Sequence, residues 1–498
     1  MTLESNLTAF AQAVAGDVKA LFESMGHIHK SVLKYGASAN GVTDSSAAIA
    51  AAIAACPDGG TVYFPPGTYA INAPIVLGKP MTLRGSGATI RGGSSPTGAL
   101  ATEGCHIYVT SGDVIIDGLR FTTPITTITP QASPSAAIYI ENAPRVKVTR
   151  CAFTGPGISG IIVTGPGSLS CEISDNTLTN VTEGIMYSVS GASYTRAVRN
   201  TIADAPLNAM SGWGNGATPN RGCLVANNII SNYGRMAIED GTNCYETRVI
   251  GNQISGGGSV EQGIALSIVS VRPYIAENTV TDWVNDGIET TGSGATVLRN
   301  VLSQRAAGRK GTGTGITVNN YTQSTQTGAT VSHNVIEDAD VGINAAQAPG
   351  TVLVNENTII GGSRGVLADT SDAATALHVV GNKVLFKDSL TSDDRAAFEM
   401  YSSAATGLRG CTVLNNHVRY ISPAANSPDG DWCVKILAND MTVAGNVFDG
   451  GGVATPQLGV SGATSSGAVV LNNRLLRGAA LNIGSYPSVV STGNVTTA

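Results

Sequence analysis

A short unit containing one asparagine recurs along most of the chain and constrains the fold more than any other feature. The unit reads apolar-x-x-Asn-x-apolar, first as Ile173-Ser-Asp-Asn176-Thr-Leu178. The twelve intervals between successive asparagines average 26.5 residues. A period in this range is typical of solenoids and propeller arrays. The asparagines of the unit stand at positions 176, 200, 228, 252, 278, 300, 334, 357, 382, 416, 446, 473 and 494.

Each unit also contains a second short strand, usually opened by glycine and a branched apolar residue, as in Gly184-Ile185 and Gly263-Ile264. Strands of three to five residues separated by Gly and Asn turns do not fit leucine-rich or helical repeats. A propeller needs about four strands in every ~40–45 residues, which this spacing does not allow. The sequence therefore predicts an all-β fold, a parallel β-helix whose stacked coils bury a continuous core and place asparagine in their turns.

The composition excludes several classes of function. Charged residues make up 13% of the chain, and 29 Lys and Arg stand against 35 Asp and Glu. Because no basic cluster occurs, we expect no nucleic-acid binding, and because no run of about 18 apolar residues occurs, we expect no membrane insertion. The eight cysteines form no CxxC pair, and the chain contains neither HExxH nor an EF-hand loop. We therefore expect buried free thiols, no metal and no cofactor.

The first residues have a different, helical pattern. Between residues 3 and 25 the apolar positions recur at intervals of eleven, as Leu3, Val14 and Met25 do. This spacing gives about 3.67 residues per turn and predicts one nearly straight helix. Two interpretations stay open: a lone helix packed on the body, or a short trimeric neck that attaches the protein to a larger assembly. We place the domains at 1–30 for this segment, 31–100 for a capping helix with the first coils, and 101–498 for the β-helix body.

Residues 35–69 read YGASANGVTDSSAAIAAAIAACPDGGTVYFPPGTY. This segment resembles the N-terminal region of pectate-lyase-like β-helix proteins, as found in bacteriophage tailspikes. By this resemblance, residues 46–55 form a helix that caps the open end of the core, and residues 59–69 form the first coil. Asp44 or Ser45 is suited to cap that helix. The resemblance implies a right-handed parallel β-helix solenoid of pectin-lyase-like type.

The resemblance also implies a function. Proteins of this kind fold in the host cytoplasm, reside in the virion tail as homotrimers, and act at the bacterial cell surface. They meet other phage tail or virion proteins through the N-terminus. The implied substrate is a bacterial surface polysaccharide, whether capsule, exopolysaccharide or O-antigen, which the protein recognises and depolymerises. No catalytic residue follows from the resemblance, because family members place their carboxylates differently and a shared fold does not determine a reaction.

Candidate catalytic residues come from the vertical alignment of coils. Residues one coil apart lie about 4.8 Å from each other. Glu239 and Glu289 fall two coils apart in the alignment, with Ala265 between them, so their backbones should be roughly 9–10 Å apart. Carboxyl groups about 6.5–9.5 Å apart suit an inverting glycosidase, in which one acid and one base flank a water. The aligned column is Met186, Ser211, Glu239, Ala265, Glu289, Thr317, Asn344 and Leu367.

Further carboxylates, aromatic rings and arginines lie near this column in the sequence. Flat aromatic rings suit the apolar faces of sugars, and arginine suits acidic sugars or lowers the pKa of a carboxyl. The supporting or replacement carboxylates are Asp240 and Asp286. The candidates for substrate binding are Trp213, Trp283, Arg235, Arg272 and Tyr187.

Three interpretations of function result from these residues. The first is a depolymerase that hydrolyses a glycan with Glu239 and Glu289 as general acid and base, both facing solvent. The second is a lyase that abstracts a proton beside a uronate carboxylate. The third is a glycan-binding adhesin on the same scaffold without catalysis. For the residues themselves a further alternative stays open, that the acids are solvated surface residues and Trp213 fills a turn.

Overall fold

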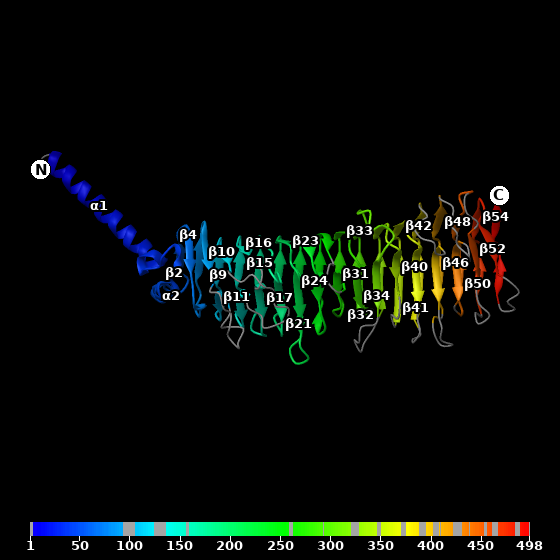
Figure 1. The fold of residues 1–498 in the computed structure, drawn as a ribbon, viewed down its shortest axis with the longest axis horizontal. Helices are drawn as coiled ribbons and strands as arrows, with labels where there is room; N and C mark the ends of the chain where they lie inside the picture. The colour runs from blue at the N-terminus through cyan, green and yellow to red at the C-terminus, as the bar shows by residue number, and fades with distance from the viewer. Residues whose placement is uncertain are drawn as a thin grey trace. The chain divides into compact units, whose positions relative to one another are not determined.

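The computed structural model shows a right-handed parallel β-helix with a short N-terminal helix (Figure 1). This confirms the fold class predicted from the repeat. The description below covers residues 3–92, 105–123, 136–155, 159–257, 262–291, 293–319, 328–345, 350–369, 375–387, 395–401, 408, 410–421, 431–437, 439–452, 456–460, 467–483 and 489–497.

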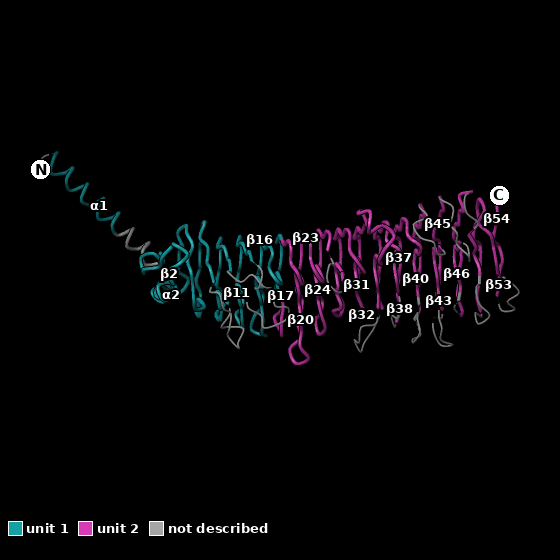
Figure 2. The backbone as a smooth tube through the Cα atoms, viewed as in Figure 1, with its two compact units in different colours: residues 1–187, 195–201 teal, residues 188–194, 202–498 magenta. Residues whose placement is uncertain are grey.

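The chain divides into two compact units (Figure 2). Unit 1 comprises residues 1–187 and 195–201, and unit 2 comprises residues 188–194 and 202–498. In both units most coils contribute one strand to each of three parallel sheets. The boundaries expected at residues 30 and 100 stay a prediction.

One coil of unit 2 shows the order of the sheets. The chain passes from β24 (Met236–Asp240) in the third sheet to β26 (Arg248–Ile250) in the first sheet, turns at Asn252, and continues into β27 (Gln253–Gly257) in the second sheet. The next coil begins with β28 (Ile264–Ile268). The other third-sheet strands of unit 2 are β20 (Met210–Trp213), β31 (Asp286–Thr291), β34 (Thr314–Asn319), β37 (Val341–Asn344), β40 (Arg364–Asp369), β43 (Ala396–Tyr401), β46 (Trp432–Leu437), β49 (Gln457–Val460) and β52 (Ala480–Asn482).

The repeated asparagines form a buried hydrogen-bonded ladder. The side-chain amide of Asn278 donates to Asn300 Oδ1 at 2.9 Å and to the carbonyl oxygen of Val249 at 3.0 Å. Its backbone N–H also donates to Asn300 Oδ1, at 3.0 Å. In unit 2 the same pattern links each asparagine to the next from 228 to 494. Each turn therefore satisfies its polar groups through the following coil.

The interior is lined by vertical columns of apolar side chains. In the third sheet of unit 2, Ile238 pairs in register with Met210 on one side and Leu266 on the other, and Leu266 pairs with Ile288. All four side chains are fully buried. The eight cysteines are likewise buried and free, as the sequence predicted.

Unit 1 contains both α-helices. Helix α1 (Leu3–Ile28) occupies the segment with eleven-residue spacing, and α2 (Ser46–Ala55) has the bounds expected of the capping helix. Ile49 and Ile53 are buried on one side of α2, and the Asp44 carboxylate accepts the backbone N–H of Ser46 at 3.0 Å. Among the helices described, none is both long enough and apolar enough to cross a membrane.

The first and second sheets of unit 1 each contain strands from successive coils. The first sheet contains β1 (His29–Ser31), β3 (Thr61–Phe64), β6 (Thr82–Gly85), β9 (Ile115–Asp117), β12 (Lys147–Thr149), β15 (Glu172–Ser174) and β18 (Arg196–Val198). The second contains β2 (Asn40–Asp44), β4 (Gly67–Ala70), β7 (Ala88–Arg91), β10 (Arg120–Thr122), β13 (Ala152–Thr154) and β16 (Thr177–Thr179).

Removing one rung of the ladder tests its contribution. Asn334→Ala leaves the backbone N–H and the side-chain amide of Asn300 without their acceptor, and both groups are buried. Because each unsatisfied buried group costs about 1–3 kcal/mol, we expect a loss of about 3 kcal/mol or more and a lower midpoint of thermal unfolding. Asn494→Ala, at a partly exposed rung, should cost less. Equal midpoints for Asn334→Ala and the unmodified chain would contradict a stabilising ladder.

Candidate functional site

A column of polar side chains lies on the face of the third sheet opposite the apolar column of unit 2. Glu239 pairs in register with Ser211 and Ser267, and Glu289 pairs with Ser267 and Thr317. Successive residues of a strand point to opposite faces, so these side chains point away from the coil interior. The two glutamates thus stand two coils apart, as the alignment predicted.

The residue between the two glutamates differs from the one predicted. Ser267, and not Ala265, occupies the intervening coil. The predicted alignment was two residues out of register at β28, because it matched Ile264 with Ile238, whereas Leu266 is the true partner. A shift of two residues preserves the face on which each side chain lies, so the alternation of apolar and polar residues does not reveal it.

Both glutamates are sheltered, which corrects the expectation that they face solvent. Glu239 and Glu289 are each 5% exposed. Asn208 Nδ2 donates to Glu239 Oε2 at 2.5 Å, and Arg235 forms an ion pair with the same oxygen at 3.1 Å. Arg235 also donates to Gln262 Oε1 at 3.4 Å. The predicted association of Arg235 with this column is therefore present, and its guanidinium directly contacts Glu239.

Glu289 has two hydrogen-bond donors of its own. Ser267 Oγ donates to its Oε2 at 2.8 Å, and Asn319 Nδ2 donates to its Oε1 at 2.9 Å. Ser267 belongs to β28 and Asn319 to β34, so the strands on both sides of β31 hold this carboxyl group. Both oxygens of the Glu289 carboxyl group therefore accept a hydrogen bond, which fixes its orientation.

Asp286 lies on the same strand and has a different environment. Thr317 Oγ1 donates to Asp286 Oδ1 at 2.5 Å, and Thr317 is also the register partner of Glu289. Burial raises the pKa of Asp286 to about 6, the Thr317 hydrogen bond opposes this, and the negative charge of Glu289 adds to the increase. Two carboxyl groups around one threonine thus differ in surroundings, as the acid and base of a hydrolase do.

Three buried polar atoms beside these carboxyl groups have no hydrogen-bond partner within the described ranges. They are Asn208 Oδ1, Ser211 Oγ and Asn319 Oδ1. Asn208 and Asn319 hold the two glutamates through their other side-chain atom, and Ser211 is the register partner of Glu239. Buried polar atoms are normally satisfied, so a group of unpaired acceptors around two carboxylates is a feature of a binding site.

The aromatic candidates separate into one exposed and two buried side chains. Trp213 ends β20 on the face that carries Ser211, is 36% exposed, and lies over Gly241, where an added Cβ would come within 2.7 Å of its ring. Trp283 and Tyr187 are fully buried. The prediction that these two side chains stack on sugar is therefore wrong: both rings fill the interior.

Two charged candidates also lie elsewhere. Asp240 follows Glu239 and so points to the interior face, where it is 1% exposed and contributes, after burial, to the raised pKa of the Cys244 thiol. The prediction that Asp240 supports the carboxylate pair is therefore wrong. Arg272 lies in the turn after β28 and forms an ion pair with Glu246 at 2.6 Å. The structure thus does not bring Arg272 to the polar column.

Sequence reasoning missed three residues that hold the glutamates: Asn208, Ser267 and Asn319. Side chains alternate between the two faces of a strand, so Asn319, two residues after Thr317, could have been predicted to lie on the same face. Asn208 precedes β20 in a turn that carries no periodic signal. Within the described part of the chain, no three His, Cys, Asp or Glu side chains gather in a way that would hold a metal ion.

Two family models match the sequence. Residues 30–238 match the model described as Rhamnogalacturonase A/epimerase, pectate lyase-like, and residues 262–426 match the model described as Right handed beta helix region. Together with the three parallel sheets, these matches define the fold as a right-handed β-helix of the pectate-lyase-like type. No curated protein sequence matches the chain.

Several solved structures resemble the chain. The surface adhesin PfbA of Streptococcus pneumoniae has a TM-score of 0.49 at 15% identity, covering 78% of this chain and 99% of that one. Gene product 12 of bacteriophage phi29 has a TM-score of 0.48 at 15% identity, covering 94% and 69%. An exopolygalacturonase of Thermotoga maritima has a TM-score of 0.44 at 12% identity, covering 73% and 96%. These likenesses concern the fold alone.

The raised pKa of Asp286 predicts a specific dependence of stability on pH. Its folded-state value of about 6 lies above the ordinary 3.8, so the folded state binds this proton more tightly than the unfolded state. The resulting stability is fully present below about pH 3.8 and is lost as the pH rises through about 6. Asp286→Asn should remove this component when unfolding is measured from pH 4 to pH 7. Identical pH profiles for the variant and the unmodified chain would contradict the raised pKa.

Proposed function

We propose that the protein recognises a bacterial surface polysaccharide and depolymerises it by hydrolysis. The observation that carries this proposal is the position of Asp286 and Glu289 on either side of Thr317. Burial raises the pKa of Asp286 to about 6, and two hydrogen bonds orient the carboxyl group of Glu289. Glycosidases use such a pair, one carboxyl group to protonate the leaving oxygen and one to assist attack at the sugar carbon.

In this mechanism Asp286 is the general acid. Its carboxyl group donates a proton to the glycosidic oxygen as the bond between that oxygen and the anomeric carbon breaks. Glu289, positioned by Ser267 and Asn319, accepts a proton from the attacking water or attacks the carbon itself. The structure supports both roles for Glu289, and they correspond to inversion and retention of configuration.

We assign Glu239 and Arg235 to substrate binding beside this pair. Their ion pair fixes the guanidinium beside the polar column, where its positive charge suits sugar carboxylate groups. Trp213 offers a partly exposed ring at the adjacent coil.

Single substitutions separate these roles. Asp286→Asn and Glu289→Gln keep size and hydrogen bonding but prevent proton transfer, so each should lower the turnover number by about 10²–10⁴-fold. Glu239→Gln should chiefly raise KM. The measurement is release of reducing ends from a panel of capsular and O-antigen polysaccharides.

Full activity of Asp286→Asn combined with loss in Glu239→Gln would contradict this assignment and favour Glu239 and Glu289 as the pair. Formation of unsaturated uronates, detected by their ultraviolet absorption, would show a lyase instead. Binding without product from any polysaccharide would indicate an adhesin.

We further propose that three copies associate and that the protein serves in a phage tail, attached through its N-terminus. Helix α1 supports the association, because its apolar stripe is uncovered in a single chain. Leu3, Leu7 and Phe10 are 84%, 68% and 69% exposed. An apolar stripe of this kind is normally covered by another helix, and eleven-residue spacing suits nearly straight helices that pack along their length. The tail location rests on the tailspike-like signature at residues 35–69.

Charges on the stripe test the association. Leu7→Glu combined with Phe10→Glu would bury charges between helices and so weaken the trimer. The variant should be monomeric at protein concentrations at which the unmodified chain is still trimeric. Gln12→Glu, a substitution outside the stripe, is the matched control and should leave assembly unchanged. Sedimentation velocity over a range of concentrations measures the effect. A monomeric unmodified chain, or equal assembly of both variants, would contradict the proposal.

A further inference from the structure

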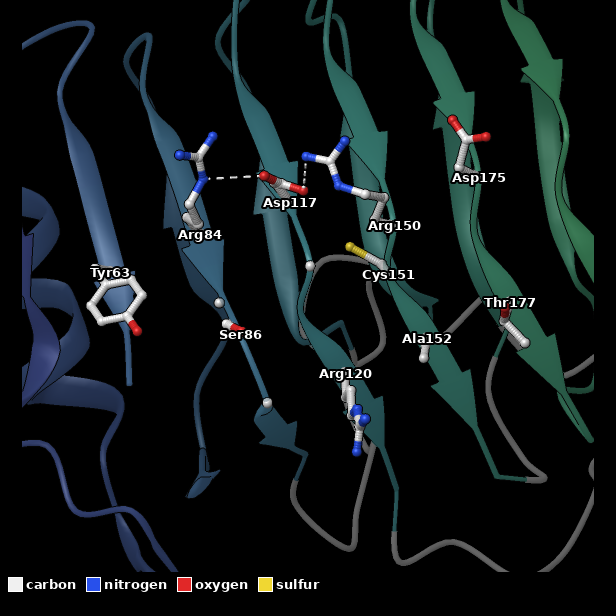
Figure 3. Close-up of a pocket in the computed structure, with 13 residues that line it drawn as sticks. Tyr63, Arg84, Ser86, Asp117, Arg120, Arg150, Cys151, Ala152, Asp175 and Thr177 are labelled. Atoms are coloured by element: carbon white, nitrogen blue, oxygen red, sulfur yellow. Dashed lines mark hydrogen bonds and ion pairs between the residues drawn. The ribbon is translucent and has the colours of Figure 1, made fainter. Parts of the chain in front are cut away.

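A second surface of the chain, in unit 1, has the features of a binding site that the proposed hydrolysis does not use. A cavity of about 560 Å³ lies along the turns between the first and second sheets (Figure 3). Its lining includes Tyr63, Arg84, Asp117, Arg120 and Arg150. These residues come from successive coils, from β3 to β13.

Three glycines line this cavity, Gly85, Gly87 and Gly118. Gly118 precedes Leu119, which occupies the position that Asn176 has two coils later. Gly118 has a φ of 71°, and a Cβ at this position would lie 2.4 Å from the carbonyl oxygen of Gly85. Only glycine fits this close approach of two backbones.

One buried carboxylate organises two of the arginines. Asp117 forms ion pairs with Arg84 at 3.1 Å and with Arg150 at 2.6 Å, from opposite sides (Figure 3). The Asp117 side chain is 7% exposed, whereas those of Arg84 and Arg150 are 59% and 64% exposed. The carboxylate therefore holds both guanidinium groups at the surface, and each keeps donors that Asp117 does not use.

A third arginine adds an uncompensated positive charge. Arg120 is exposed, and no carboxylate pairs with it in the described part of the chain. Asp175 also lines the cavity, but Arg199 binds it through two bonds of 2.8 Å. The lining thus carries three arginines and two aspartates, an excess of one positive charge in a chain whose net charge is −6.

The cavity is elongated along the stack of coils. Tyr63 pairs in register with Arg84, Arg84 with Asp117, and Asp117 with Thr149. At about 4.8 Å per coil, this column extends over roughly 14 Å. Tyr63 stands at one end with a partly exposed ring, and Thr177, an exposed hydroxyl, lies toward the other (Figure 3). An aromatic ring, a hydroxyl and guanidinium groups in a row suit a chain of sugars that bears carboxylates.

We propose that this cavity, which we call the arginine groove, binds an acidic oligosaccharide segment. Sugar carboxylates lie on Arg84, Arg120 and Arg150, because guanidinium matches a carboxylate in shape and charge. One sugar ring packs on Tyr63. The groove lies in unit 1 and the carboxylate site in unit 2, so binding here is a separate property of the chain that does not depend on hydrolysis.

Arg120→Gln tests the groove without disturbing the fold, because the exposed Arg120 side chain forms no ion pair within the described ranges. The full-length chain is titrated calorimetrically with galacturonate oligosaccharides. We expect the dissociation constant to rise at least tenfold, since a hydrogen bond to a charged group contributes about 1.5–3 kcal/mol. Arg196→Gln is the matched control, an exposed arginine of the same unit on β18, outside the groove; it should bind like the unmodified chain.

Three further measurements identify the ligand and separate this binding from the proposed hydrolysis. Neutral galactose oligosaccharides of equal length should bind at least tenfold more weakly, and inorganic phosphate should not displace the acidic oligosaccharide at equal concentration. Glu289→Gln should retain binding, so failure of the proposed hydrolysis would leave this result standing. Unchanged affinity in Arg120→Gln, equal binding of neutral sugars, displacement by phosphate, or loss of binding in Glu289→Gln would each overturn the proposal.

Discussion

The hydrogen bonds between successive coils are the interaction on which the rest of the fold depends. Ion pairs such as Arg199–Asp175 and Arg395–Asp431 also join neighbouring coils. Strand pairing provides hydrogen-bond partners for the backbone groups of the three sheets. The asparagine ladder provides them for the turn between the first and second sheets. Because Asn278 bonds both to the backbone of the preceding coil and to Asn300 of the next, one side chain connects three levels. Each coil is thereby aligned on its neighbours at a constant spacing.

Because the spacing is constant, side chains on the outward face of the third sheet are held at regular distances from each other. Glu239, Ser267 and Glu289 occupy equivalent positions of consecutive coils, so their separations follow from strand pairing. Individual hydrogen bonds then make these positions chemically different. Arg235 neutralises Glu239, two donors hold Glu289, and a half-buried position keeps the proton on Asp286 to a higher pH.

The sequence predicted the class of fold, both helices and the face on which the glutamates lie, because these depend on period and alternation. The predictions from sequence were wrong where the period of the repeat and the alternation of side chains along a strand carry no information. Ala265 and Ser267 lie on the same face, so only the actual strand pairing distinguishes them. Trp283 is buried with its indole nitrogen beside Gly313 of the following coil, and its proximity to Glu289 in the sequence did not reveal this. Asn208 reaches Glu239 from a turn without a repeat.

The asparagine ladder also gives unit 2 an electrical polarity. Every side-chain amide from Asn228 to Asn473 directs its N–H toward the oxygen of the following asparagine, so the amide dipoles are parallel and add along the stack. Peptide dipoles aligned in an α-helix sum in the same way to partial charges at its two ends. The positive end of this array faces the coil of Asn494, and the negative end faces the coil of Asn228. The stack of asparagine side chains therefore has two electrically distinct ends.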